Sequence, residues 1–403
     1  MNKAFFRPLI ILLLAVIMLG AIASFLPAWE NDVFPIKSMT WFRDLFSAPM
    51  PDSLALPTII VPIESELLPL DSFTVRLQSL KSNPRQSLRI GYFGDSIIEG
   101  DLISGRLRSE LQKTYGGSGV GLVPVTSIVN EFRKTIRHSF SRNWETVSFM
   151  SAGSVPVGMI GYAFIPRNYY MQESVVETTV DSLMTNSPMA DSIATPNPSP
   201  PKKVSKRFYT NESPWVEYAA ANVTGGSTEL RRIRLFYSNA GAASYVNVSH
   251  DDAPAQRMQL TQGEEVQVLD LSAATPIKKI RLTFSAEDPI HVYGVSFDDH
   301  SGVYVDNLSV RGFSGMYFQR IPEGHLAAFH RALDYDLIIL QYGENVSRPD
   351  IRDYGFYTKG MTRTIRHIQS ALGDVPILVI SAHDRSIRKD GIFQTSPDIP
   401  ILV

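Results

Sequence analysis

Apolar positions follow two different periods along this chain, and the difference divides it into parts. Short, almost continuous apolar runs stand on both sides of a long central region, and each lies beside a stretch with apolar residues at helical spacing. Such runs are typical of parallel strands buried on both faces, and their alternation with helices predicts right-handed crossovers. We expect strands at 88–93, 336–342 and 375–381, and helices at 105–115, 324–333 and 354–372.

The central region, 139–297, alternates apolar and polar residues with a period of two and carries Gly, Asn and Asp between the runs. This pattern is typical of a β-sandwich. It predicts one α/β domain, made of 87–138 and 298–403, that is interrupted by an inserted β domain. Pro, Ser and Asn dominate 185–206, which we expect to be a disordered, exposed loop. The expected strands are 146–150, 215–218, 233–237, 244–248, 265–269, 279–284 and 290–295.

The N-terminus carries an uncharged apolar run at 9–26, preceded by Lys3 and Arg7. The run nearly spans a bilayer, and the positive charges before it orient the N-terminus to the cytoplasm. We therefore expect a signal anchor at 1–29 and a tether with an approach helix at 30–86. A signal peptide cleaved near Ala21 and Ala23 is the alternative. Either way, the remainder is expected on the periplasmic side of a bacterial inner membrane or free in the periplasm.

Composition narrows the chemistry. The 403 residues are 44% hydrophobic and 19% charged, with a net charge of −2 and no cysteine. Near-neutral charge gives no nucleic-acid footprint, and the lack of cysteine excludes thiol nucleophiles, disulfides and zinc–thiolate sites. The glycine-rich run 116–121 lacks the Lys-Ser/Thr of a phosphate-binding loop, and the scattered histidines show no metal-ligand spacing. We expect neither a cofactor nor a metal.

Three segments at expected strand ends carry the candidate chemistry. Gly94-Asp95-Ser96 follows the first strand, Gly312 lies in a predicted loop at 304–315, and Asn345 follows the strand at 336–342. The carboxyl ends of parallel strands meet at one edge of a sheet. Ser96 offers a nucleophile, and N–H groups of Ser96, Gly312 and Asn345 would form an oxyanion hole. The alternatives are plain: Asp95 or Ser96 as a helix N-cap, and Asn345 as a turn or cap residue.

These segments resemble the SGNH (GDSL-type) esterase superfamily. Gly94-Asp95-Ser96, Asn307 with Gly312, and 343–345 are similar in order and context to its first three blocks, and the string 94–122 is similar to exported proteins that act on O-acetyl groups of cell-wall or exopolysaccharide sugars. The resemblance implies a flavodoxin-like α/β fold with an inserted carbohydrate-binding-like β-sandwich. It also implies an acyl-enzyme on Ser96, supported by Asp95, in an esterase or an acetyltransferase of peptidoglycan or polysaccharide.

The family's last block, Asp-x-x-His, supplies a general base, and no such motif follows Ser381. His383 is the one histidine just past an expected core strand, and the adjacent Asp384 cannot easily orient it. The other histidines are expected at the surface or in packing. A truncated chain or a pseudoenzyme would explain this departure, and we expect weak or no turnover of p-nitrophenyl acetate. Robust activity lost in both Ser96→Ala and His383→Ala would identify His383 as the base.

Two functional hypotheses therefore stand. The first is an exported carbohydrate O-acetylesterase or O-acetyltransferase, with acetylated polysaccharide or peptidoglycan as substrate and a membrane acyltransferase as an optional partner. The second is a non-catalytic, membrane-tethered polysaccharide-binding protein, in which Trp215, Tyr237 or Tyr245 stacks on sugars, although sandwich core is the more ordinary place for these rings. The coding DNA beyond Val403 would separate them, because an in-frame Asp-x-x-His favours the enzyme.

Overall fold

The computed structural model describes residues 69–83, 86–151, 155–175, 203–223, 226–389 and 391–403. The expected signal anchor and residues 30–68, 84 and 85 of the expected tether and approach segment lie outside these ranges. Among the described residues, no helix is both long and apolar enough to cross a bilayer.

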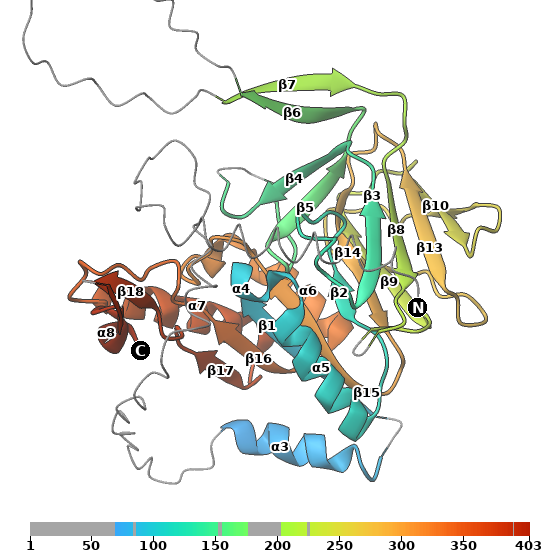
Figure 1. Ribbon diagram of the computed structural model, residues 1–403. Coiled ribbons are helices and arrows are strands. Elements are labelled where there is room, and N and C mark those ends of the chain that lie inside the picture. The colour runs from blue at the N-terminus through green and yellow to red at the C-terminus, as the bar shows by residue number, and fades with distance from the viewer. Residues whose placement is uncertain (1–68, 84–85, 152–154, 176–202, 224–225, 390) are drawn as a thin grey trace, which may run out of the picture. The chain divides into compact units, whose positions relative to one another are not determined.

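A parallel sheet forms the α/β part, with the strand order β15-β1-β16-β17 (Figure 1). Its strands are β15 (Gly302–Ser309), β1 (Ser87–Gly94), β16 (Tyr335–Gln341) and β17 (Ile377–Ile380). Gly94, at the end of the central strand β1, pairs with Ser309 on one side and Gln341 on the other. This register brings the carboxyl ends of three strands to the same level, where active residues of α/β sheets gather.

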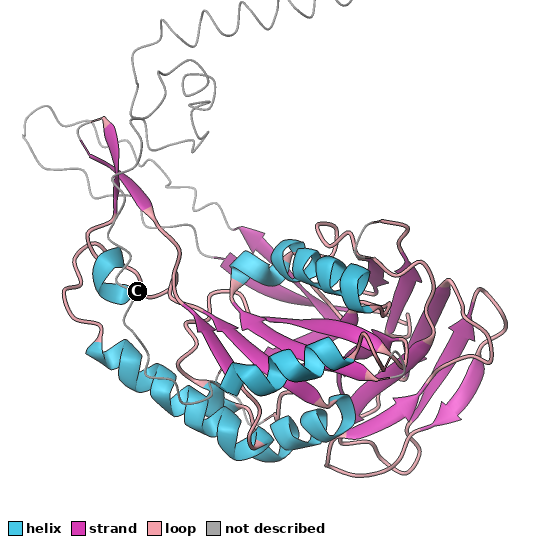
Figure 2. Cartoon of the chain, turned by 90° about the horizontal axis from the view of Figure 1, so that it is seen from below, coloured by secondary structure: helices cyan, strands magenta, loops and turns pink. Residues whose placement is uncertain are grey.

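Helices cover both faces of this sheet (Figure 2). On one face, Leu88, Ile90 and Tyr92 pack with apolar residues of α3 (Pro69–Ser79), α4 (Ser96–Glu99) and α5 (Leu102–Tyr115). On the other, Phe93 and Ile338 pack with α6 (Glu323–Leu333) and α7 (Gly355–Leu372). Burial on both faces explains why these strands are continuously apolar in sequence.

Two antiparallel sheets are built from residues between β1 and β15 along the chain, with the orders β11-β10-β13-β8-β3 and β12-β9-β14-β5-β4. Alternate residues are buried, as β8 shows with Val216, Tyr218 and Ala220. The period-two pattern is therefore confirmed as antiparallel strands. Their bounds are β3 Ile136–Phe140, β4 Trp144–Ser148, β5 Tyr162–Pro166, β8 Trp215–Ala220, β9 Arg232–Ser238, β10 Tyr245–His250, β11 Gln256–Gln259, β12 Gln267–Asp270, β13 Lys279–Phe284 and β14 His291–Asp298.

The structure corrects three predictions. The first half of the loop expected at 304–315 belongs to strand β15, because the run beginning at Gly302 pairs with β1 along its whole length. The antiparallel part begins before residue 139: β2 (Gly121–Val123) pairs with β14, and β3 begins at Ile136. The last residues of the loop expected at 185–206 belong to β7 (Lys203–Tyr209), which pairs with β6 (Tyr169–Val175), whereas 176–202 lies outside the described residues.

The C-terminal segment is short and irregular. It consists of a hairpin of β18 (Ser386–Lys389) and β19 (Ile392–Thr395) followed by α8 (Ile399–Leu402). Earlier in the chain, a 3-10 turn, η1 (Phe318–Arg320), precedes α6. The buried carboxylate of Asp398 ties the C-terminal segment to the loop after β16. It accepts hydrogen bonds from the hydroxyls of Ser347 at 2.7 Å and Tyr354 at 2.8 Å.

Buried charges join the parallel sheet to an antiparallel one. Arg89 of β1 contacts Asp306 of β15 at 2.7 Å and Asp298 of β14 at 2.6 Å. Arg234 of β9 contacts the same Asp298 oxygen at 2.7 Å. Burial alone would lower the pKa of Arg89, but the two carboxylates outweigh it and raise that pKa. The two arginines likewise lower the pKa of Asp298 although burial acts to raise it, so the pair Arg89–Asp298 stays ionised.

Candidate active site

Ser96 stands at the tip of the central strand, as the sequence predicts. It is the first residue of α4 and is exposed to solvent. Its hydroxyl makes no hydrogen bond within the described residues, and the first N–H groups of a helix lack intrahelical acceptors. The hydroxyl and the N–H of Ser96 are therefore both free to meet a ligand.

Asp95 performs the capping role that the alternative interpretation assigned to this turn. Its Oδ1 accepts the N–H of Ile97 at 2.9 Å, and it is the N-cap of α4. The cap does not use the hydroxyl of Ser96, so the capped turn and the exposed nucleophile coexist. Burial raises the pKa of Asp95, while the Ile97 N–H and His383 act to lower it.

Asn345 brings all three predicted segments together. Its Nδ2 donates to Asp95 Oδ2 at 2.7 Å and to the carbonyl oxygen of Phe313 at 3.0 Å. One side chain thus touches the turn before Ser96 and the loop next to Gly312. Both of its N–H bonds are engaged, so a substrate oxygen would have to replace or share one of these two acceptors.

Gly312 meets the requirements of a close-approach donor. Its φ is +74°, and a Cβ placed there would meet no atom within 4 Å, so the residue borders open space. Its N–H makes no hydrogen bond with any described residue. The positive φ favours glycine at this position, and the open space leaves room for a substrate carbonyl.

Asn307, the other residue of the second block, supports the site from beneath. Its Nδ2 donates to Ser104 Oγ at 2.7 Å and to the carbonyl of Ile98, and its Oδ1 accepts the hydroxyl of Ser309 at 2.8 Å. These bonds fix the end of α4 and the start of α5 against β15. Asn307 is buried, and these bonds give it a structural role at the edge of the site.

His383 has a partner that the sequence did not suggest. Glu344 Oε1 lies 2.9 Å from His383 Nδ1 and also accepts the backbone N–H of His383 at 2.9 Å. The contact arises because Gly343 and Ala382 follow neighbouring strands and pack so closely that a Cβ on Gly343 would lie 2.7 Å from that of Ala382. Glu344, not Asp384, orients the ring, and this leaves Nε2 to face other groups.

Five of the other histidines are engaged elsewhere. Ring nitrogens of His138, His250, His325 and His367 lie within hydrogen-bond distance of backbone carbonyls, and His330 accepts the N–H of Tyr335. Burial lowers the pKa of His138 to about 4. No group of three or more candidate metal ligands occurs in the part of the chain that the structure describes.

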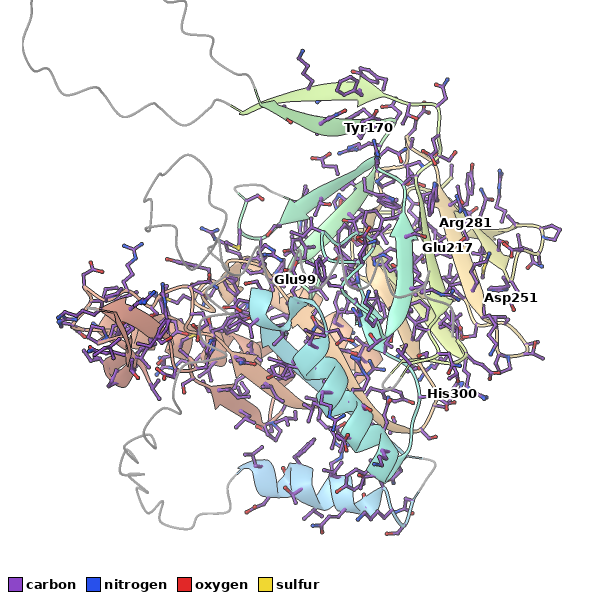
Figure 3. All side chains as sticks on the ribbon, in the orientation of Figure 1. Glu99, Tyr170, Glu217, Asp251, Arg281 and His300 are labelled. Atoms are coloured by element: carbon purple, nitrogen blue, oxygen red, sulfur yellow. The ribbon has the colours of Figure 1, made fainter. Side chains whose placement is uncertain are left out.

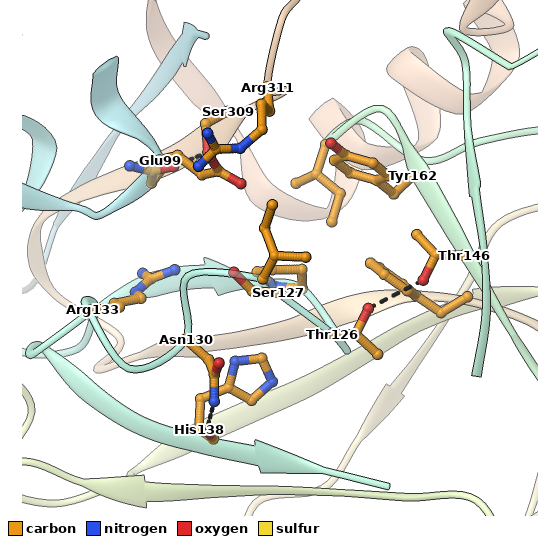
Figure 4. Close-up of a pocket in the computed structure, with 15 residues that line it drawn as sticks. Glu99, Thr126, Ser127, Asn130, Arg133, His138, Thr146, Tyr162, Ser309 and Arg311 are labelled. Atoms are coloured by element: carbon orange, nitrogen blue, oxygen red, sulfur yellow. Dashed lines mark hydrogen bonds and ion pairs between the residues drawn. The ribbon is translucent and has the colours of Figure 1, made fainter. Parts of the chain in front are cut away.

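A hollow of about 310 Å³ adjoins the site between α4, the end of β15 and the antiparallel strands (Figure 4). Glu99, three residues after Ser96, pairs with Arg311 at 2.6 Å, and Arg311 immediately precedes Gly312. Tyr162, Thr146 and Ser309 also line it. The sequence did not indicate this hollow, since its walls come from segments far apart in the chain.

We compared the chain with known proteins by sequence and by structure. No protein-family model matches the sequence, and no curated protein does. The fold is similar to that of a solved peptidoglycan O-acetylesterase, with a TM-score of 0.58, 18% identity, and 83% of this chain and 78% of that chain covered. At 18% identity, this similarity shows a shared fold. The chain also aligns with a family two carbohydrate esterase from Cellvibrio japonicus, with a TM-score of 0.17, 12% identity, and 41% of this chain and 69% of that chain covered. A further alignment is with the salicylyl-acyltransferase SsfX3 from a tetracycline biosynthetic pathway, with a TM-score of 0.18, 14% identity, and 46% of this chain and 63% of that chain covered.

Proposed function

We propose that this chain carries a serine O-acyl transfer site that acts on O-acetyl groups of a polysaccharide, as an esterase or an acetyltransferase. One observation supports the proposal most: Asn345 touches both Asp95 and the Phe313 carbonyl, so the nucleophile turn and two donor loops meet at one rim. The fold similarity to a peptidoglycan O-acetylesterase agrees with this substrate class.

The chemistry follows from the positions of these groups. The Ser96 oxygen attacks the acetyl carbonyl, and the developing oxyanion is bound by the N–H groups of Ser96 and Gly312. Asn345 joins them when the oxyanion takes the place of one of its two acceptors. His383 takes the hydroxyl proton of Ser96 and passes it to the sugar oxygen as the bond between that oxygen and the acetyl carbon breaks, so the acetyl group remains esterified to Ser96. Water or a second sugar hydroxyl then accepts the acetyl group.

The base in this proposal is His383. Glu344 holds Nδ1 and thereby selects the ring orientation in which Nε2 is free, which is the arrangement that a Ser–His–carboxylate site uses. The His383 ring also acts to lower the pKa of Asp95, the neighbour of Ser96. We assign the polysaccharide chain to the hollow beside Glu99 and Arg311, whose volume of about 310 Å³ accommodates a sugar ring.

Export is part of the proposal and rests on the sequence pattern. The apolar run at 9–26 with Lys3 and Arg7 before it would place the site on the periplasmic side of the inner membrane, anchored or released. Acetylated peptidoglycan is the corresponding substrate there. A membrane acyltransferase would be a partner only in the transferase form of the reaction.

The test is formation of the acyl-enzyme itself, which does not depend on turnover. The full chain is incubated with p-nitrophenyl acetate and digested, and the peptide that contains Ser96 is examined by mass spectrometry. We expect acetyl on Ser96, and its loss in Ser96→Ala. Ser151→Ala is the matched control, because Ser151 is also an exposed serine but does not line the hollow beside Glu99. An unlabelled Ser96 would overturn the proposal and favour the non-catalytic polysaccharide-binding alternative.

A further inference from the structure

A second hollow lies on the antiparallel part of the molecule, between the end of β3 and the β6–β7 hairpin. Its volume is about 440 Å³, and it shares no lining residue with the hollow beside Glu99. Phe140 of β3, Tyr170 of β6 and Trp215 of β8 contribute aromatic walls. Three rings from separate strands therefore face one concavity.

Trp215 is held in a fixed orientation. Its indole N–H donates to Glu212 Oε1 at 2.6 Å, and the guanidinium carbon of Arg281 lies 3.8 Å from its ring centroid. Arg281 is itself paired with Glu217 at 3.5 Å, and Figure 3 shows these two on the same side of the molecule as Tyr170. A ring that is already immobilised loses little entropy when a ligand stacks on it.

The aromatic surface continues from the hollow onto the hairpin. Tyr170 stacks on Phe208, with the ring centroids 5.7 Å apart and the planes 17° from parallel. Phe208 remains 42% exposed and Tyr209 72% exposed. Exposed rings gathered in this way are typical of binding surfaces rather than of ordinary solvated strands.

A buried polar atom also lacks its partner at this hollow. Asn143 lines it and is only 1% exposed. Its Nδ2 donates to the carbonyls of Arg167 and Glu212, each at 2.8 Å, whereas its Oδ1 has no hydrogen-bond partner among the described residues. Because Oδ1 is sealed from solvent, Asn143 serves to fix one wall of the hollow through its two hydrogen bonds.

We propose that this hollow binds a sugar ring of a polysaccharide chain, as a second carbohydrate site separate from the Ser96 rim. The apolar face of a pyranose stacks on fixed aromatic rings, and its hydroxyls meet polar side chains of the lining, which include Arg142 and Glu212. The charged side chains at the rim, Arg142 and Glu212, have opposite signs, which suits a neutral polyhydroxyl ligand better than an anion. The inference requires no chemistry at Ser96 and goes beyond the proposed function.

The experiment measures binding of the full chain carrying Ser96→Ala, so that catalysis plays no part. The probes are soluble chitohexaose, followed by calorimetry, and de-O-acetylated peptidoglycan sacculi, followed by sedimentation. In this background we expect Tyr170→Ala and Trp215→Ala each to weaken binding about tenfold, the loss of one stacking contact. Tyr170→Ala lies on the hairpin and should leave the melting temperature unchanged, so it covers the case in which Trp215→Ala fails to fold.

Tyr245→Ala is the matched control. Tyr245 also lies beneath an arginine, with Arg257 at 3.9 Å from the ring centroid, but it does not line the hollow, so its removal should leave both affinities unchanged. Absence of binding by the parent chain to both probes, or equal binding by the parent and Tyr170→Ala, would overturn the proposal. Acetylation of Ser96, measured separately, should be unaffected by Tyr170→Ala, so the two proposals can fail independently.

Discussion

The two ends of strand β1 carry polar groups in opposite states. At the amino end, Arg89 is 3% exposed and is neutralised by Asp298 and Asp306. At the carboxyl end, Ser96 is exposed and its hydroxyl makes no hydrogen bond among the described residues. The buried charges stabilise the contact between two sheets, whereas the free hydroxyl and the N–H of Gly312 contribute nothing to folding. Polar groups that the fold leaves without partners are those available to a substrate.

Replacement of Ser96 should give the largest effect, and it should be confined to activity. Ser96→Ala removes the nucleophile, so the rate of acylation by p-nitrophenyl acetate should fall by about 10³ or more. The free energy of unfolding in urea should change by less than about 0.5 kcal/mol, because the exposed side chain has no partner to lose. A stability loss of several kcal/mol would mean that Ser96, like Arg89, stabilises the fold.

Replacement of Arg89 should reverse that outcome. Arg89→Met leaves Asp306 and Asp298 with less compensation in the interior, and the expected destabilisation is about 3–5 kcal/mol in urea unfolding. The acylation rate per folded molecule should not change. Arg106→Met is the control: Arg106 pairs with Glu110 at 3.0 Å, and both side chains are exposed, so less than about 1 kcal/mol is expected. Equal losses in the two variants would remove the distinction.

Asn345 should matter both for the stability of the fold and for activity, since it joins loops and faces solvent. Asn345→Ala should lower the acylation rate about 10²- to 10³-fold, the usual cost of one oxyanion donor. It should also destabilise the fold by about 1–3 kcal/mol, because buried Asp95 loses a hydrogen bond. Asn239→Ala is matched, since Asn239 also donates to a carbonyl, that of Pro289 at 2.7 Å, but far along the chain from the rim. An unchanged acylation rate would restrict Asn345 to joining the loops.

Glu344 and His383 test whether the rim contains its own base. If Glu344 acts by orienting His383, then Glu344→Gln and His383→Gln should each slow acylation about 10- to 100-fold, and the double variant should be no slower than His383→Gln. Asp384→Asn is the control, because Asp384 neighbours His383 in sequence without orienting it. Additive effects of the Glu344 and His383 replacements would show that the two residues act separately.

The sequence predicted three of the four strands of the parallel sheet, most helices and the meeting of the first and third blocks, because each depends on local period or on the rule that strand ends share an edge. Strand β15 was missed as a strand, since Asp306 and Asn307 interrupt its apolar run, yet Asp306 is neutralised by Arg89 from the next strand. Glu344 was missed for a related reason. It and His383 each lie three residues beyond neighbouring strands, and applying the strand-end rule to this pair would have found the contact.

The C-terminal segment should respond to pH through the buried carboxyl of Asp398. Asp398 is fully buried, and although burial acts to raise its pKa, hydrogen bonds from Ser396, Ser347 and Tyr354 lower that pKa to about 2. A carboxyl whose pKa is lowered by folding stabilises the structure above its ordinary pKa, and this contribution is lost as the pH falls toward 2. Hydrogen-exchange protection at 386–403 should therefore decrease between pH 4 and pH 2 in the parent chain.

The control for this last effect is Asp398→Asn, which keeps the size of the side chain but cannot ionise. Its protection at 386–403 should be lower than that of the parent at pH 5, because the amide forms weaker hydrogen bonds with the three hydroxyls, and it should change little between pH 4 and pH 2. Acylation of Ser96 at pH 7 should be nearly unaffected, since Asp398 contacts the loop after β16 and not Asn345. A parent-like pH dependence in Asp398→Asn would show that other carboxyls hold this segment in place.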